Sequence, residues 1–177
     1  MQIQKNLPYY LTVLGIFSCL KFSFTLANNN NLQFLLKPTN KLVGFLTNSH
    51  SVFFSNKGYY FENLNILIDK HCSGFNFWVL SFLIFSYLLL KYFNKRIYKI
   101  ATIPLALTTA YLLTLFVNTS RIFVAIIIQD YTKNTVLEQQ DVLHEIIGVI
   151  TNLTFLMLTY LLVEKLLIFK QNNAKHT

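Results

Sequence analysis

Charged residues are scarce in this chain. They make up 12% of its 177 residues, whereas hydrophobic residues make up 54%. An average soluble domain carries about twice that charged share. A domain of this size has too small an interior to hide so much apolar surface from water. The composition therefore excludes an ordinary soluble domain and indicates a protein whose solvent is lipid. The length suits a single domain over residues 1–177.

Cysteine is also scarce, and two cysteines do not make a disulfide framework. Cys19 lies inside an apolar run, and Cys72 lies in a polar approach to another, so we interpret them as separate thiols. Internal repeats, Gly/Ser linkers and low-complexity tails are missing from the sequence. No motif calls for a cofactor.

The net charge of +8 raises the question of nucleic acid binding. Such proteins carry a basic stripe, with aromatic residues between the cations when they bind single strands. Here the lysines and arginines gather instead at the ends of apolar runs, which is the pattern of membrane topology. The charge therefore does not indicate a nucleic acid partner, and the lipid bilayer is the expected surroundings.

Apolar runs long enough to cross a bilayer dominate the rest of the sequence. Three runs of 18 residues carry no charge: residues 73–90, 100–117 and 146–163. As helices each would be about 27 Å long, close to the thickness of the hydrocarbon core. A fourth run, residues 7–27, is interrupted only by Lys21, which can snorkel toward an interface. Its end resembles a signal-peptide cleavage site, but the lysine favours a retained anchor. We expect an all-α, polytopic transmembrane helix bundle with about four spans.

The connections between these runs are of mixed character. Residues 32–46 are apolar but are broken by Lys37-Pro38, so we expect an interfacial or re-entrant segment there. Residues 49–65 are polar and aromatic, which suits a loop at the lipid headgroups. The apolar run 122–128 is too short to span, and it either continues the third helix or dips back into the membrane.

The distribution of basic residues predicts the orientation. The short loop between the second and third spans holds four basic residues and no acid: Lys91, Lys95, Arg96 and Lys99. Such a loop is expected in the cytoplasm. The lysine-rich C-terminal tail agrees with this side. Cys72, Arg121 and His144 then fall together on the outer face.

Cys72 stands in His71-Cys72-Ser73-Gly74, directly before the second span. A thiol at a helix N-terminus feels unpaired N–H groups and the positive end of the dipole, which favour the thiolate. Gly74 would let a substrate backbone or another helix come close. The alternative reading is a small buried residue at a helix start.

Arg121 lies at the outer end of the third span, between apolar runs. A guanidinium at this depth is costly unless it finds acceptors, so it is a candidate functional residue. Asn118, three residues earlier, would share its helical face. The alternative is an interfacial anchor that snorkels to lipid phosphates.

His144 lies where the last span begins, and its ionisation range suits a general acid or base. Asp141, one turn earlier, is placed to orient the ring. The sequence begins like a zinc-protease helix, but Gly148 stands where the second histidine of H-E-x-x-H must be. A metal site from His71, Asp141, His144 and Glu145 stays a minor alternative, as does a plain polar residue at a membrane boundary.

Together these motifs put one nucleophile, one base and one permanent cation on the same membrane face, at the ends of different helices. Nucleophilic acyl transfer needs such a set: an activated thiol, a group that accepts and returns protons, and a positive partner for the oxyanion.

The three motifs resemble the exosortase/archaeosortase family of membrane transpeptidase-like proteases. That family carries Cys-Ser/Ala-Gly before a transmembrane helix, then Asn-x-x-Arg-Ile/Val, then a His or Arg that opens a final helix. The matching positions are Cys72-Ser73-Gly74, Asn118, Arg121, Ile122 and His144. The resemblance covers roughly residues 65–164. The short chain and the run from Cys72 to Phe77 look most like the compact K-type exosortases.

The resemblance implies a cysteine protease or transpeptidase in the bacterial cytoplasmic membrane. Cys72 would attack a carbonyl in the C-terminal sorting signal of an exported, membrane-anchored protein. His144 would move protons, and Arg121 would stabilise the oxyanion. His71 departs from many relatives, which have an acidic or small residue there, and it could compete for the base role. The alternative from another class is a non-catalytic membrane subunit, transporter-like or an assembly factor, in which Cys72 merely packs.

Overall fold

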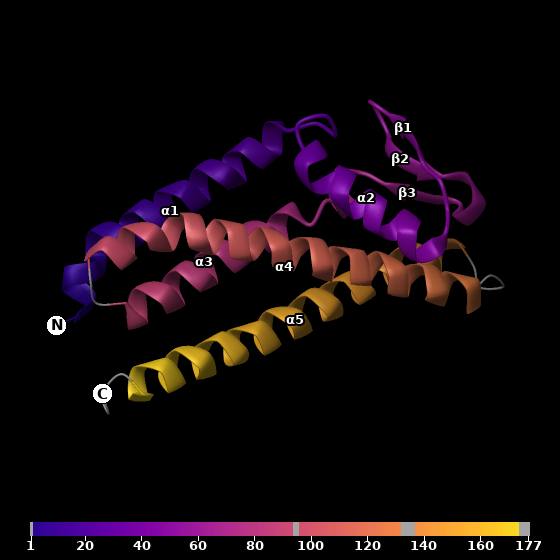
Figure 1. Cartoon of the computed structure of the whole chain (residues 1–177). Helices are drawn as coiled ribbons and strands as arrows, with labels where there is room; N and C mark the ends of the chain where they lie inside the picture. Colours follow the sequence, from indigo (N-terminus) through magenta and orange to yellow (C-terminus); the bar gives the residue numbers. More distant parts are fainter. Residues whose placement is uncertain (1, 94–95, 132–136, 174–177) are drawn as a thin grey trace. The chain divides into compact units, whose positions relative to one another are not determined.

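The computed structural model describes residues 2–93, 96–131 and 137–173, with side chains for residues 6–93, 96–129, 146–170 and 172–173. Helices dominate it. Along the chain, three short strands follow the second α-helix and precede the third (Figure 1). In chain order the elements are α1 (Gln2–Leu26), α2 (Gln33–Thr47), β1 (Val52–Phe54), β2 (Gly58–Phe61), the 3-10 turn η1 (Glu62–Leu64), β3 (Ile66–Ile68), the 3-10 turn η2 (Lys70–Cys72), α3 (Phe75–Tyr92), α4 (Arg96–Tyr131) and α5 (Leu137–Asn173).

Within the described residues, four segments are long and apolar enough to cross a membrane: Asn6–Leu26, Lys70–Tyr92, Arg96–Gln129 and Ile146–Lys170. Each contains or overlaps one of the four predicted spans. The prediction of an all-α, polytopic helix bundle with four spans is therefore confirmed. The helix α4 has 36 residues and is about 54 Å long, well beyond the thickness of a hydrocarbon core.

Residue contacts divide the chain into two compact units. Unit 1 comprises Met1–Thr25, Asn76–Leu113 and Phe155–Thr177, and unit 2 comprises Leu26–Phe75 and Thr114–Thr154. The expectation of one domain over residues 1–177 stays a prediction.

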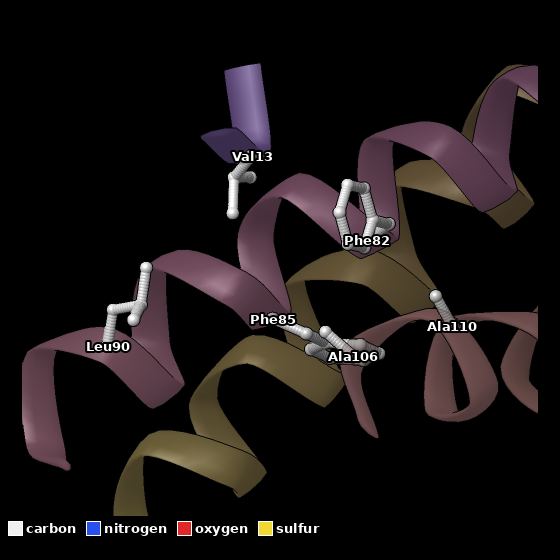
Figure 2. Close-up of a cluster of buried hydrophobic side chains, with 6 residues drawn as sticks. All are labelled: Val13, Phe82, Phe85, Leu90, Ala106 and Ala110. Carbon is white, nitrogen blue, oxygen red and sulfur yellow. The ribbon is translucent and has the colours of Figure 1, made fainter. Parts of the chain in front are cut away.

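Unit 1 has an apolar core made by three helices (Figure 2). Its buried members are Val13 from α1, Phe82, Phe85 and Leu90 from α3, and Ala106 and Ala110 from α4. The two alanines stand four residues apart, so they lie on one face of α4. Small residues on a transmembrane helix allow close helix packing, and here they leave room for the aromatic rings of α3.

Polar contacts also join helices of unit 1 to one another. The Asn6 side chain on α1 donates to the backbone oxygen of Leu90 at 2.9 Å. Lys91 Nζ lies 3.0 Å from Glu164 Oε1, which connects α3 to α5. The ammonium group of Lys21, the one charge within the first apolar run, donates to Asn76 Oδ1 at 2.7 Å. Each of these polar groups thus finds a partner on another helix, as a low-dielectric environment requires.

Unit 2 contains α2 packed against a small antiparallel sheet of order β1-β2-β3 (Figure 1). The buried side chains of α2 are Leu35, Leu36, Thr39 and Val43. Tyr59 on β2 donates its hydroxyl to Gln33 on α2 at 2.7 Å. Gly44 of α2 lies beside the ring of Phe61, where a Cβ would be 3.6 Å from a ring carbon. The sheet leads through β3 directly into the turn that carries Cys72.

One detail of the predicted connections was wrong. Residues 49–65, expected as a loop, contain β1 and β2, whose pairing begins at Val52↔Tyr60. The segment that contains Lys37-Pro38 forms α2, a single helix of 15 residues. That helix is about 22 Å long, too short to span, so its interfacial location stays a prediction. Residues 122–128 continue α4, one of the two expected outcomes.

Candidate functional site

The turn that carries Cys72 is held by the carboxylate of Asp69. Asp69 precedes the single-turn helix η2 and accepts hydrogen bonds from the backbone N–H groups of His71 and Cys72, at 3.0 and 3.2 Å. Aspartate is a preferred residue for this capping role because its oxygens satisfy N–H groups that have no partner in the helix. The backbone of the candidate nucleophile is therefore fixed before α3 begins.

Ser73 and Gly74 join this turn to α3. Ser73 is buried, donates its hydroxyl to the backbone oxygen of Lys70 at 2.7 Å, and accepts from the N–H of Phe75 at 3.3 Å. Gly74 has a φ of +72°, in the left-handed region that favours glycine. A Cβ there would lie 3.0 Å from Thr114 Cγ2 and 3.1 Å from Asn118 Cγ. The close approach expected at Gly74 is thus made by α4.

Asn118 connects α4 to the backbone of Cys72. Its side chain is 3% exposed, and its amide Nδ2 donates to the backbone oxygen of Cys72 at 2.6 Å. A buried amide that lost this acceptor would leave both groups without a hydrogen bond, at a cost of about 1–3 kcal/mol. The Asn-x-x-Arg and Cys-Ser-Gly motifs, 46 residues apart in the sequence, therefore meet in unit 2.

Arg121 is half-buried on α4, three residues after Asn118. Its guanidinium is near enough to the Cys72 thiol for its charge to act on that thiol, as is the carboxylate of Asp69. A Cβ added at Gly148 on α5 would lie 3.3 Å from Arg121 Nη1 and 3.4 Å from Arg121 Cδ. The arginine thus has the candidate nucleophile within electrostatic reach, and its side chain lies against the backbone of α5.

The remaining predicted residues are only partly described. His144 and Asp141 belong to α5, but their side chains lie outside the described residues, so their predicted roles stay predictions. His144 stands four residues before Gly148, and positions four apart share one face of a helix. His71 is exposed. Among the side chains that are described, no group of three or more His, Cys, Asp or Glu could hold a metal ion.

Three residues of this site make contacts that were not predicted from the sequence. They are Asp69, Thr114 and Gly148. Asp69 had a readable signal, since an aspartate three residues before Cys72 fits the start of a short helical turn. Thr114 and Gly148 had none, because their importance comes from what another helix places beside them.

The arrangement in unit 2 suits attack by sulfur. A thiol stands on a backbone held by Asp69 and Asn118, and the positive charge of Arg121 acts on that thiol. The sequence-predicted residues Cys72, Ser73, Gly74, Asn118 and Arg121 all belong to this unit.

Comparison with known proteins gives one match. No curated protein and no solved structure is significantly similar to the chain. A model of the family described as transmembrane exosortase matches residues 9–161, well over half of the sequence and including both motifs that meet at Cys72. The chain therefore belongs to the transmembrane exosortase family.

Proposed function

We propose that this chain is a membrane cysteine peptidase or transpeptidase, of the compact K-type, with Cys72 as its nucleophile. The observation that supports this most is the contact between the two motifs: Asn118 binds the backbone of Cys72, and Arg121 is within electrostatic reach of its thiol. A packing cysteine needs neither partner. An enzyme that makes an acyl intermediate needs a held nucleophile and a nearby cation.

In the proposed reaction, the Cys72 thiol gives its proton to His144, and the sulfur attacks a peptide carbonyl of the substrate. Arg121 stabilises the negative oxygen that forms. The C–N bond then breaks, and His144 returns the proton to the leaving amine, which leaves a thioester on Cys72. An amine acceptor or water then gives a proton to His144 and attacks the thioester carbonyl. The C–S bond breaks, and His144 returns the proton to the Cys72 sulfur, which restores the thiol.

Asn118 has a supporting role in this proposal. Its bond to the Cys72 backbone oxygen fixes the distance between α4 and the nucleophile, and Arg121 lies one helical turn further along the same helix. Correct placement of reacting groups is worth several kcal/mol of the barrier, so a tie at the nucleophile's own backbone acts on the rate. Asp141 would orient the ring of His144 from one turn earlier in α5.

The proposed substrates are exported proteins that end in a short recognition motif, a transmembrane helix and a basic cytoplasmic end. The proposed orientation places Cys72 on the outer face of the bacterial cytoplasmic membrane, because the loop of residues 91–99 is strongly basic. A substrate with the same basic-inside orientation would present its motif at that face.

Co-expression tests both activity and orientation. The chain is expressed with a reporter protein that carries such a C-terminal signal, taken from the same genome. We expect the reporter to lose its C-terminal helix only when the chain is present, and its shortened form to be recovered outside the cytoplasmic membrane. A reporter with the motif deleted but the helix intact is the control. A reporter that stays full-length with abundant chain contradicts the activity, and a shortened form in the cytoplasm contradicts the orientation.

A further inference from the structure

Gly148 is a glycine in the interior of α5 that its own backbone does not require. Glycine within a helix costs about 0.5–1 kcal/mol relative to alanine. The described glycines with positive φ are Gly58 and Gly74, so Gly148 is not needed for a left-handed conformation. The reason for a glycine here must therefore lie in what packs against it.

The neighbour of Gly148 is the side chain of Arg121. Gly148 is buried, and the three nearest atoms to a Cβ built on it are Nη1, Cδ and Cζ of Arg121, at 3.3, 3.4 and 3.8 Å. All three atoms belong to one side chain, so the arginine lies across the helix at this position. The first distance is tighter than most contacts of a Cβ atom, and the second is at the lower limit of ordinary van der Waals contact. An alanine methyl would have to displace the guanidinium by a few tenths of an ångström.

The same guanidinium also acts on the candidate nucleophile. Arg121 acts electrostatically on the Cys72 thiol, and both residues and Gly148 belong to unit 2. A displacement of the guanidinium by a side chain on α5 therefore alters its position relative to the sulfur.

We propose that Gly148 is a positioning residue: the absence of a side chain at this point of α5 sets where the Arg121 guanidinium lies relative to the Cys72 sulfur. The proposal rests on the proposed function, because it assigns Gly148 an effect on the same reaction. If Gly148 sets the position of Arg121, it also affects the reactivity of the Cys72 thiol in the absence of a substrate.

The test substitutes Gly148→Ala and uses Gly15→Ala as a matched control. Gly15 also lies within a helix, but a Cβ there meets nothing within 4 Å, so the same chemical change should be harmless. We expect Gly148→Ala to lower reporter processing about tenfold at unchanged abundance, because small displacements of catalytic groups have effects of that order or more. Gly15→Ala should process at the wild-type rate. Wild-type processing by Gly148→Ala overturns the proposal.

A second readout separates positioning from a general structural role. In a Cys19→Ala background, the rate at which N-ethylmaleimide alkylates Cys72 is measured in membranes. That rate reports the thiolate fraction, which a nearby cation favours. We expect Gly148→Ala to change it by about threefold or more when Arg121 is present. In the Arg121→Lys background, whose side chain lacks Cζ and Nη1, Gly148→Ala should change the alkylation rate of Cys72 little.

The outcomes also distinguish this inference from the proposed function. Equal effects of Gly148→Ala with Arg121 intact and in the Arg121→Lys variant overturn the positioning role, whatever the reporter does. If the reporter is never processed but the two substitutions still couple in the alkylation rate, the proposed function fails and the positioning of Arg121 stands.

Discussion

Replacing Cys72 with alanine is expected to abolish reporter processing, a loss of at least about a thousandfold, while the chain stays as abundant as the wild type. The loss follows because the thioester cannot form without the sulfur. Stability should change little, since the bonds that hold this turn are made by backbone groups and by Asp69, Ser73 and Asn118, not by the thiol. Processed and full-length reporter are quantified by immunoblot over a time course.

The chain supplies its own control for this experiment. Cys19 is the other free thiol, exposed on α1 in unit 1. Cys19→Ala should leave processing unchanged, which shows that the loss is specific to position 72. Normal processing by Cys72→Ala would instead support a membrane subunit in which this cysteine only packs.

Arg121→Gln is expected to lower processing by about 100-fold to 1,000-fold, the range seen when one group that stabilises an oxyanion is removed. Glutamine keeps some hydrogen bonding but lacks the charge that acts on Cys72. The processing rate of Arg121→Lys should lie between those of the wild type and Arg121→Gln, because an ammonium supplies a point charge without the planar donors of a guanidinium. Initial rates of processing at matched chain abundance provide the measurement.

The control for Arg121 lies on the same helix. Arg96 is exposed at the start of α4, belongs to unit 1, and has the same type of side chain as Arg121. Arg96→Gln leaves the neighbouring lysines in place, so the orientation should hold and processing should stay near the wild-type rate. If Arg121→Gln and Arg96→Gln process equally well, Arg121 has no part in the reaction.

Much of the fold could be predicted because it follows from composition. Uncharged runs of 18 residues have few stable alternatives to a spanning helix in lipid, and all four expected spans overlap helices of sufficient length. The small sheet could not be predicted in the same way. Its strands have only three or four residues, as in Gly58–Phe61, and one of its contacts, from Tyr59 to Gln33 on α2, joins residues far apart in the sequence. Strands this short leave little trace in the sequence pattern.

The candidate site, too, could be predicted only in part from the sequence. The sequence suggested that Cys72, Asn118 and Arg121 belong together, from residue type and from their place at the ends of spans. It did not suggest the capping bond of Asp69 or the contact between Arg121 and Gly148, because a contact across helices depends on how the helices pack. In the sequence, Gly148 is notable only because it replaces the second histidine of a zinc-protease motif.

The most direct test of the account is to find the acyl group on the sulfur. Chain and reporter are co-expressed, the reaction is quenched in acid, and peptides of the chain are mapped by mass spectrometry. The account predicts the reporter's new C-terminus attached to the peptide that contains Cys72, and its release by hydroxylamine, which cleaves thioesters. A reporter that is processed while its acyl group appears on another residue, or while Cys72 stays unmodified at every time point, would contradict it.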